Sequence, residues 1–323
     1  MKEIAIITGG DSAEREISIS SAKVVLDHLD KRKYTARIID IKNDNWTISI
    51  KNKKININKE DFSVNIQDKK IKFEYVFIAL HGPPAENGLI QGYFDNLKVP
   101  YSSCDANTSS ITFNKIECNK RLTSLGFRCA RSLCYKRYQK INIEEIINKL
   151  GLPCFIKPNQ SGSSFGVSKI KEAKNIPEAI QQALIHDNIV LIEEFLDGKE
   201  LSCGVMQKDN RVEALPITEI ISENEFFDYQ AKYQGLSQEI TPARINNNLT
   251  KKIKRISEDI FIKMKLKGVC RIDFILIKDI PYIIEINTIP GLSKESIIPK
   301  QAKEAGISLC QLFNLWINTT LNK

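Results

Sequence analysis

The sequence lacks any apolar run of the roughly 18–20 residues that a membrane-spanning helix requires, so we expect no membrane association. Its first residues, MKEIAIITGGD, hold only the apolar stretch Ile4–Ile7 before two glycines, which is too short for an export signal. Together the two absences predict a protein of the cytoplasm.

The sequence also lacks a Cys-x-x-Cys pair, although it contains eight cysteines. A zinc site or a dithiol redox site is therefore unsupported. Several cysteines lie inside apolar, strand-like runs, such as Cys154 in LPCFIK and Cys270 in GVCRIDF. We interpret them as small buried residues in a reducing compartment.

Positive charge exceeds negative charge by a formal +8, but the lysines are scattered and often stand beside acids. No combined aromatic and basic motif of the kind that binds RNA is present, so we expect no nucleic-acid partner. The excess positive charge suits an anionic small-molecule ligand. The 323 residues, 42% of them hydrophobic, are enough for two or three subdomains.

The first part of the chain has the pattern of βα units, which predicts an α/β fold. Residues 74–80, EYVFIAL, form a continuous apolar run, as in a buried parallel strand. Residues 42–72, rich in Lys, Asn and Ile, predict a small hairpin or a variable loop. The other elements expected here are strands at 3–8 and 34–41 and helices at 15–30 and 89–97.

We divide the chain into an N-terminal domain over 1–103, a central subdomain over 104–198 and a C-terminal subdomain over 199–323. The polar stretch 222–244 has no clear periodicity, and its length indicates a functional lid rather than a connection. The central elements expected are helices at 106–126, 142–150 and 176–187 and strands at 154–158, 167–171 and 189–195. The C-terminal elements expected are two strands before the polar stretch, a helix at 247–266, strands at 268–277 and 281–287, and a helix at 300–320.

The strongest chemical signal comes from the last two predicted strands, which are joined by a connection of hairpin length. If the turn centres near Asp279, Asp273 faces Glu285. Arg271 then faces Asn287, and alternation along each strand puts all four polar side chains on one face. The other face, which should pack in the core, carries Ile272, Phe274, Ile284 and Ile286.

Two opposed carboxylates repel each other, so a positive charge must hold them on this face. Oxygen atoms of Asp273, Glu285 and Asn287 suit Mg²⁺, which usually takes a few protein oxygens together with substrate phosphates. The alternative is an ion-pair cluster, in which Arg271 alone neutralises the two acids. The hairpin by itself leaves both interpretations open.

A Gly/Ser loop, in the sequence KPNQSGSSFG, links two predicted strands. Gly162 and Gly166 allow backbone N–H groups to approach an anion. Ser163 and Ser164 add hydroxyl donors, and Lys157 places a cation beside the loop. The pattern is not a Walker A motif. A plain hairpin loop explains it equally well when it is taken alone.

Three strand ends carry candidate binding residues. The strand IVLIEEF ends in acids, among them Glu193, that could hold an adenine and ribose or could simply be solvated. Glu14, after the first strand, could orient an amine-bearing substrate, although helix capping by Ser12 is the simpler explanation. A lone histidine such as His81 is more often structural, but it lies at the carboxyl end of a buried strand, where ligands bind.

Six motifs, in one order from about residue 3 to residue 300, together resemble the D-alanine–D-alanine ligases of the ATP-grasp superfamily. They are GGDSAEREISISSA, HGPPAENGLIQGYFD, KPNQSGSSFGV, LIEEFLDGKE, FDYQAKY and RIDFILI…IIEINTIPGLSKESIIP. The resemblance implies an ATP-grasp fold: a parallel-sheet α/β domain followed by two ATP-grasp subdomains, α+β in parts. It implies ATP-dependent ligation of two D-alanines through an acyl phosphate, for peptidoglycan precursor synthesis.

The resemblance also implies roles for individual residues, beginning with ATP. Those expected at its phosphates, on or beside a closing loop, are Lys115, Lys157, Ser163 and Ser164. Those expected around its adenine and ribose are Glu193, Phe195, Leu196 and Glu200. Two Mg²⁺ ions, which Mn²⁺ can replace, would bind Asp273, Glu285 and Asn287.

The amino-acid substrates have their own implied set. Glu14 would bind the ammonium group of the first D-alanine, with His81 in the same substrate site. Arg271 and the Gly291 backbone would stabilise the tetrahedral intermediate. Ser296 would hold the carboxylate of the second D-alanine.

The polar lid would contribute two further residues. Lys232 would belong to the ATP-binding set, and Tyr233 would reach toward Glu14 and Ser163. The implied partners are ATP and D-alanine, and the resemblance suggests a homodimer.

The sequence departs from the usual family pattern in places. Pro83 and Pro84 follow His-Gly where many members are richer in glycine, and they should stiffen the loop. Ser161 stands where many members carry Glu, and residues 101–104, YSSC, replace a more usual Tyr-Thr-Gly-Ser. These differences bear on substrate affinity rather than on the reaction class.

Other functions compete with this one. A ligase that makes D-alanyl-D-lactate or D-alanyl-D-serine is disfavoured by Tyr233, which resembles the dipeptide-forming type. A nucleotide-binding regulatory protein without catalysis is disfavoured because the phosphate and metal sets are both complete. Another ATP-grasp enzyme, joining different acids and amines, is disfavoured by the N-terminal signature and the lid.

Overall fold

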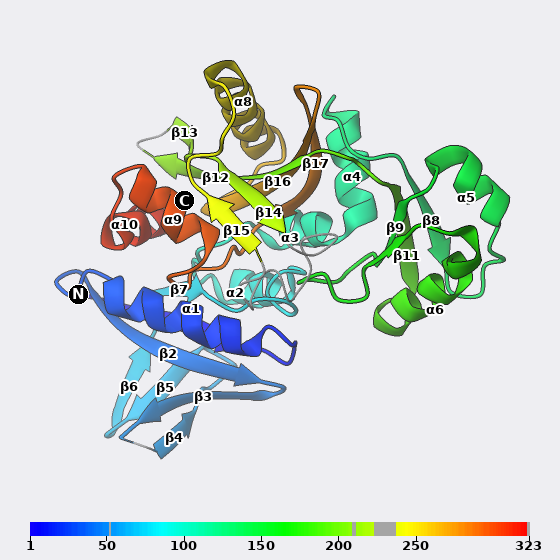
Figure 1. The fold of residues 1–323 in the computed structure, drawn as a ribbon. Coiled ribbons are helices and arrows are strands. Elements are labelled where there is room, and N and C mark those ends of the chain that lie inside the picture. The colour runs from blue at the N-terminus through cyan, green and yellow to red at the C-terminus, as the bar shows by residue number, and fades with distance from the viewer. Residues whose placement is uncertain (52, 209–210, 223–236, 322–323) are drawn as a thin grey trace.

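The structure is a computed structural model that describes residues 1–51, 53–208, 211–222 and 237–321. In this part of the chain the strands form three main sheets, and Figure 1 shows them as separate blocks with helices packed around them. No helix among the described residues is long and apolar enough to span a membrane.

The N-terminal sheet runs in the order β4-β3-β2-β1-β7. Its centre is parallel, as predicted: β1 (Lys2–Gly9) lies between β2 (Tyr34–Lys42) and β7 (Tyr75–Ile78). α1 (Arg15–His28) connects β1 to β2. Ile4–Ile7 are fully buried because both faces of this sheet are covered. The carboxyl ends of β1 and β7 therefore open on one edge, where Glu14 and His81 follow.

Residues 42–72 hold more regular structure than the predicted hairpin or loop. β3 (Asn45–Ile50) and β4 (Lys53–Asn56) extend the N-terminal sheet in antiparallel pairing, and β5 (Ser63–Ile66) pairs separately with β6 (Lys69–Lys72). Ile48 is buried within β3. The abundant lysines and asparagines hide the alternation of apolar residues that forms these strands.

The central sheet is antiparallel, in the order β10-β9-β11-β8. The sequence pattern does not predict β8, a short edge strand of mixed polarity with mostly exposed side chains. α5 and α6 pack against the sheet around one core cluster. The elements are β8 (Ser132–Lys136), α5 (Ile143–Leu150), β9 (Cys154–Pro158), β10 (Ser168–Ile170), a 3-10 turn at Ala173–Asn175, α6 (Ile176–His186) and β11 (Ile189–Glu194).

The C-terminal sheet runs in the order β15-β14-β12-β16-β17, with β13 paired to β12. Alternating residues of β12 face opposite layers: Leu201 and Val205 contact the α3, α4 and α8 side, whereas Met206 contacts the α10 side. The elements are β12 (Lys199–Lys208), β13 (Arg211–Ala214), β14 (Thr218–Ser222), β15 (Ser237–Ile240), α8 (Asn247–Lys263), β16 (Val269–Ile277) and β17 (Ile280–Asn287).

Two predicted helices are each divided. The helix expected at 106–126 is α3 (Ala106–Phe113) and α4 (Lys115–Ser124), because Asn114 adopts an extended conformation and caps α4 by accepting from the Glu117 N–H at 3.0 Å. The helix expected at 300–320 is likewise α9 (Ile297–Glu304) and α10 (Leu309–Leu321). Gly306, with φ of +70°, separates them. Of the predicted long helices, α8 runs unbroken.

The polar stretch 222–244, whose sequence has no clear periodicity, contains a strand near its C-terminal end. β15 pairs with β14 there, from Ser237 opposite Ser222 to Ile240 opposite Glu219. Before the stretch there are three strands, not the predicted two, because a hairpin joins β12 to β13.

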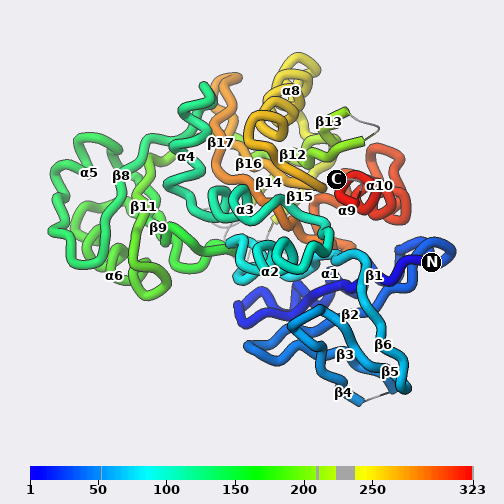
Figure 2. Tube along the Cα trace, turned by 180° about the vertical axis from the view of Figure 1, so that it is seen from behind, coloured from blue at the N-terminus to red at the C-terminus, as the bar shows by residue number. Residues whose placement is uncertain are grey.

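The packing separates the central sheet from the rest of the molecule. One core cluster joins Ile4 and Phe77 of the N-terminal sheet to Phe313 and Trp316 of α10 and Val269 of the C-terminal sheet. The core cluster of the central sheet draws on none of these elements. Seen from behind in Figure 2, α4 lies between β17 and the central sheet, and α2 (Leu89–Leu97) lies beside α3. The subdomain boundaries at 103 and 198 stay a prediction.

Candidate active site

A cavity of about 720 Å³ adjoins one of about 280 Å³ where the three sheets approach one another. The larger lies between the central and C-terminal sheets, and the smaller reaches the carboxyl edge of the N-terminal sheet. Both are lined by Lys115, Ser161, Ser163, Arg271 and Glu285. Two ligands, one in each cavity, would therefore meet at these shared residues.

The larger cavity gathers every described residue that the resemblance assigns to ATP. They are Lys115, Lys157, Ser163, Ser164, Glu193, Phe195, Leu196 and Glu200. Lys157 and Glu193 form an ion pair although each side chain is about nine-tenths buried. Such a pair keeps a cation and an acceptor ready inside the cavity at a high desolvation cost, which is typical of a ligand site.

Ile284 corrects part of the predicted hairpin. The register slips after Asp273, so that Phe274 lies opposite Ile283 rather than Ile284. Ile283 is buried in the core at 2% exposure, whereas Ile284 turns away from the core and lines the larger cavity. A β-bulge has this effect because one extra residue reverses the alternation of side chains.

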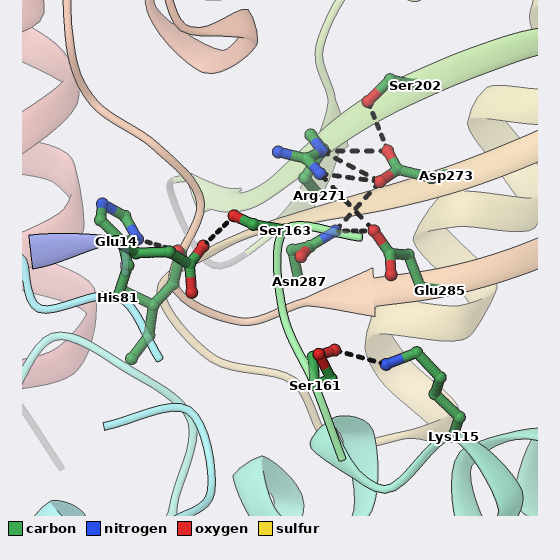
Figure 3. Close-up of polar contacts among 11 residues, drawn as sticks. Glu14, His81, Lys115, Ser161, Ser163, Ser202, Arg271, Asp273, Glu285 and Asn287 are labelled. Carbon is green, nitrogen blue, oxygen red and sulfur yellow. Dashed lines mark hydrogen bonds and ion pairs between the residues drawn. The ribbon is translucent and has the colours of Figure 1, made fainter. Parts of the chain in front are cut away.

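The polar face of the hairpin has the predicted register, with Asp273 opposite Glu285 and Arg271 opposite Asn287. Arg271 donates from Nε to Asp273 Oδ1 at 3.0 Å and from Nη2 to Oδ2 at 2.8 Å. Asn287 Nδ2 donates to Asp273 Oδ2 at 3.0 Å (Figure 3). In this state Arg271 supplies the positive charge, as in the ion-pair alternative.

Mg²⁺ nevertheless fits the same donors. Among the described residues there is no group of three or more His, Cys, Asp or Glu side chains placed to hold a metal. Mg²⁺ commonly binds through one or two carboxylates together with phosphate oxygens and water, and Asp273 and Glu285 provide that number. Binding would require Arg271 to release Asp273 and Asn287 to turn its amide oxygen inward.

Glu14 lies beside the Gly/Ser loop. Glu14 is 8% exposed, and its carboxylate accepts a hydrogen bond from Ser163 Oγ (Figure 3). A Cβ at Gly162 would lie 2.8 Å from Glu14 Oε2, so a larger residue there would displace the Glu14 carboxylate from this position. Ser12 Oγ accepts from the Glu14 backbone N–H at 3.2 Å, but the N-cap residue of α1 is Glu14 and no side chain caps the helix, so the predicted capping by Ser12 is wrong. The Glu14 carboxylate is thereby left for the cavity.

His81 is buried and anchors the loop that follows β17. Its Nδ1 lies 3.0 Å from the Ile289 carbonyl oxygen, so this nitrogen carries the proton, and Nε2 accepts from Ser21 Oγ at 3.0 Å. Burial lowers the pKa of His81, which favours this neutral form. Ser21 Oγ also accepts from Leu292 N–H at 3.2 Å. His81 thus lines the smaller cavity and also positions the Pro-Gly turn.

The other two residues predicted to bind the substrates lie on and shortly after that turn. Gly291 and Ser296 line the smaller cavity, and Ser296 Oγ lies 2.8 Å from Ser293 Oγ at the start of α9. Lys115 Nζ donates to the Ser161 carbonyl oxygen at 2.6 Å, which ties α4 to the Gly/Ser loop. Lys232 and Tyr233 fall outside the described residues.

Glu86 is a cleft residue that the sequence pattern did not single out. It lines the smaller cavity, and burial, followed by repulsion from Glu14, raises the pKa of its carboxyl to about 8. The signal that could have found it is its place in HGPPAENG, where it is the only acid beside His81.

Ser202 and Asn119 were missed for another reason. Ser202 Oγ donates to Asp273 Oδ1 at 2.6 Å, and Asn119 Nδ2 donates to Glu193 Oε1 at 2.9 Å. Both contacts cross between elements that the sequence does not show to be neighbours. Only the spacing of Asn119, one helical turn after Lys115, hinted at a shared face.

The fold, the nucleotide-sized cavity between two sheets and the shared cluster of cations and acids define an ATP-grasp enzyme. Known families match in two parts: D-ala D-ala ligase N-terminus over residues 3–104 and D-ala D-ala ligase C-terminus over residues 122–318. The chain belongs to the D-alanine–D-alanine ligase family.

Individual relatives agree over the whole length. The chain is 48% identical to a D-alanine–D-alanine ligase of Flavobacterium johnsoniae, covering 99% of this chain and 100% of the relative. It is 46% identical to one of Christiangramia forsetii, covering 100% and 99%. Among solved structures, the VanG D-Ala:D-Ser ligase of Enterococcus faecalis matches with a TM-score of 0.88 at 29% identity, covering 99% of each chain. The ATP complex of a Bacillus anthracis D-alanine–D-alanine ligase matches with a TM-score of 0.81 at 26% identity, covering 99% and 98%.

Proposed function

We propose that the two adjoining cavities carry out the reaction of the family, with ATP in the larger one and two D-alanines in the smaller one. The chain is a D-alanine–D-alanine ligase, an ATP-dependent enzyme that supplies peptidoglycan synthesis. The observation that carries the assignment is the set of residues lining both cavities. The reaction requires such a meeting point, because a carboxylate in one cavity must attack the γ-phosphate in the other.

The first step builds negative charge on the transferred phosphoryl group. The carboxylate of the first D-alanine attacks the γ-phosphorus, the bond to ADP breaks, and an acyl phosphate forms. Lys115 and Lys157 both line the larger cavity beside the Gly/Ser loop and would attract the phosphates, with Ser163 and Ser164 as donors. Glu14 would hold the ammonium group of the first D-alanine, because its buried carboxylate needs a cation.

The second step places charge on the carbonyl oxygen. The amine of the second D-alanine attacks the acyl phosphate carbon, and phosphate leaves from the tetrahedral intermediate. Arg271 and the Gly291 backbone lie on the wall where that oxygen would develop charge. Ser296, beside the N-terminus of α9, is suited to the carboxylate of the second D-alanine.

Asp273, Glu285 and Asn287 would hold two Mg²⁺ ions, for which Mn²⁺ can substitute. When bound there, the ions neutralise phosphate charge and orient the phosphate oxygens. Arg271, released from Asp273, would then be available to the substrate oxygen. Lys232 and Tyr233 complete the proposed set on the lid, and a homodimer is the proposed assembly.

Phosphate release from ATP in the presence of Mg²⁺ tests the proposal directly. D-alanine should support release, and L-alanine should not. D-serine and D-lactate, offered with D-alanine, test the second-substrate site. Release that proceeds equally well with L-alanine, or none with D-alanine although ATP binds, would contradict the proposed substrate.

A further inference from the structure

Helix α4 contacts both of the sheets that enclose the larger cavity. Its apolar side, with Cys118 and Leu122, belongs to the core cluster of the C-terminal sheet. Its polar side faces the central sheet, and Figures 1 and 2 both show α4 between β17 and that sheet. The helix therefore packs with the C-terminal sheet and is hydrogen-bonded to the central sheet.

Those hydrogen bonds begin at the first turn of α4. The Ile116 N–H donates to Asn159 Oδ1 at 3.0 Å, and the Lys115 N–H donates to the Asn159 carbonyl at 3.2 Å. Asn159 follows β9 directly and is 1% exposed. The start of α4, which carries Lys115, is thus fixed to the strand end that carries Lys157.

The second connection lies one turn further along. Asn119 is four residues after Lys115, so both project from the same face of α4. Asn119 Nδ2 donates to Glu193 Oε1 at 2.9 Å, with Asn119 at 9% and Glu193 at 5% exposure. The other oxygen of Glu193 pairs with Lys157. The carboxylate is therefore held at both oxygens, with lone pairs left for a ligand.

Adenine offers a matching group. The exocyclic amine is the hydrogen-bond donor of the base, and a carboxylate that is fixed and desolvated accepts from it strongly. Phe195 and Leu196 beside Glu193 supply apolar surface for the ring. If the Glu193 carboxylate could rotate freely, its oxygens would not stay directed at the amine. The Asn119 amide, which fixes the direction of the carboxylate, therefore contributes to recognition of the base.

We propose that Asn119 is a positioning residue for purine recognition, which aims Glu193 at the exocyclic amine of ATP and links base binding, through α4, to the phosphate-binding Lys115. The inference rests on the proposed function, in that ATP occupies the larger cavity. An asparagine suits this task because its amide is neutral: it orients the carboxylate without removing its negative charge, so Glu193 remains a strong acceptor for the amine.

The test compares ATP with inosine triphosphate, which has a carbonyl oxygen in place of the exocyclic amine. Binding of each nucleotide is measured by calorimetry for the wild type, Asn119→Ala and Asn119→Asp. Lys120→Ala is the control, because Lys120 is the next residue of the same helix and its side chain is 68% exposed. The binding assay needs no catalysis, so failure of the ligase reaction and failure of this inference are separable.

We expect Asn119→Ala to weaken ATP binding by about tenfold, the loss of a hydrogen bond to a charged group, and to change inosine triphosphate binding much less. Asn119→Asp, of the same size but carrying a like charge against Glu193, should weaken ATP binding further. The KM for ATP should rise while kcat at saturating ATP stays near the wild-type value.

Equal weakening of both nucleotides in Asn119→Ala would show a merely structural role and overturn the inference. The inference also fails if ATP binding is unchanged in this variant, or if the wild type does not distinguish the two nucleotides. Lys120→Ala should match the wild type in every assay.

Discussion

The proposed active site combines two regions whose contacts differ in sequence separation. The β16–β17 hairpin brings Asp273 and Asn287 together across 14 residues of chain, and its geometry follows from strand alternation and one tight turn. The contact between Glu14 and Ser163 joins residues 149 positions apart. The hairpin could form its polar face almost alone, whereas the second contact exists only when the N-terminal and central sheets have docked. The proposed sites for the metal and the tetrahedral intermediate therefore depend on the local geometry of one hairpin. The proposed site for the first D-alanine depends on long-range packing between sheets.

Arg271→Ala, in the hairpin, should have the largest effect. It removes the cation that we place at the developing oxyanion, and loss of one such donor lowers kcat by roughly 10²–10³-fold. D-alanine-dependent phosphate release measures the loss. Arg255→Ala, on the exposed side of α8, is the control and should keep full activity. Near-normal activity in Arg271→Ala would remove the residue from the mechanism.

Ser202→Ala tests the hairpin without touching a proposed ligand. Ser202 Oγ orients Asp273 from the neighbouring strand at 2.6 Å, and loss of such an outer partner weakens metal binding by roughly 10–100-fold. The Mg²⁺ concentration for half-maximal activity should rise accordingly, with kcat largely recovered at high Mg²⁺. An unchanged Mg²⁺ dependence would favour the ion-pair interpretation of the hairpin.

Glu14→Gln tests the long-range region. It removes the charge proposed to meet the first D-alanine's ammonium group, so the KM for D-alanine should rise by about tenfold or more. The KM for ATP should change little. Glu16→Gln is the matched control, because Glu16 lies two residues further along α1 and is exposed. A similar KM change in both variants would point to the α1 dipole instead.

Glu86→Gln should give the smallest effect, on stability. Burial and Glu14 raise the pKa of Glu86 to about 8 in the folded protein, from 4.5. Between these two values the folded state keeps a proton that the unfolded state has lost, so stability falls as pH rises through this window. Glu86→Gln has no such proton to lose, so at pH 8.5 it should unfold at a higher temperature than the wild type. The difference should be about 2–4 °C for each kcal/mol of unfolding free energy that the variant gains. The gain should vanish near pH 4.

Much of the fold followed from periodicity and turn chemistry. The parallel β1, β2 and β7, the helices α1, α2, α5, α6 and α8, and the hairpin register from Arg271 to Asp273 were all predicted. The predictions that were wrong concern positions where one residue interrupts an otherwise regular sequence pattern. Asn114 caps a new helix inside an apparently continuous one, and the bulge after Asp273 sends Ile284 to the cavity rather than to the core. Within residues 42–72 the predicted hairpin occurs twice, as β3–β4 and β5–β6, whereas the pairing of β3 with β2 was not predicted because it joins the segment to the N-terminal sheet.

The amino acids alone were sufficient for the family, the reaction class and the polar face of the hairpin, because ordered motifs and strand alternation are properties of the chain itself. They could not show that Glu14 meets Ser163, that His81 braces the Pro-Gly turn, or that Asn119 and Ser202 hold Glu193 and Asp273. Each of those contacts joins elements distant in sequence. Their geometry depends on how the three sheets pack, and packing is settled by the whole core at once rather than by any one segment.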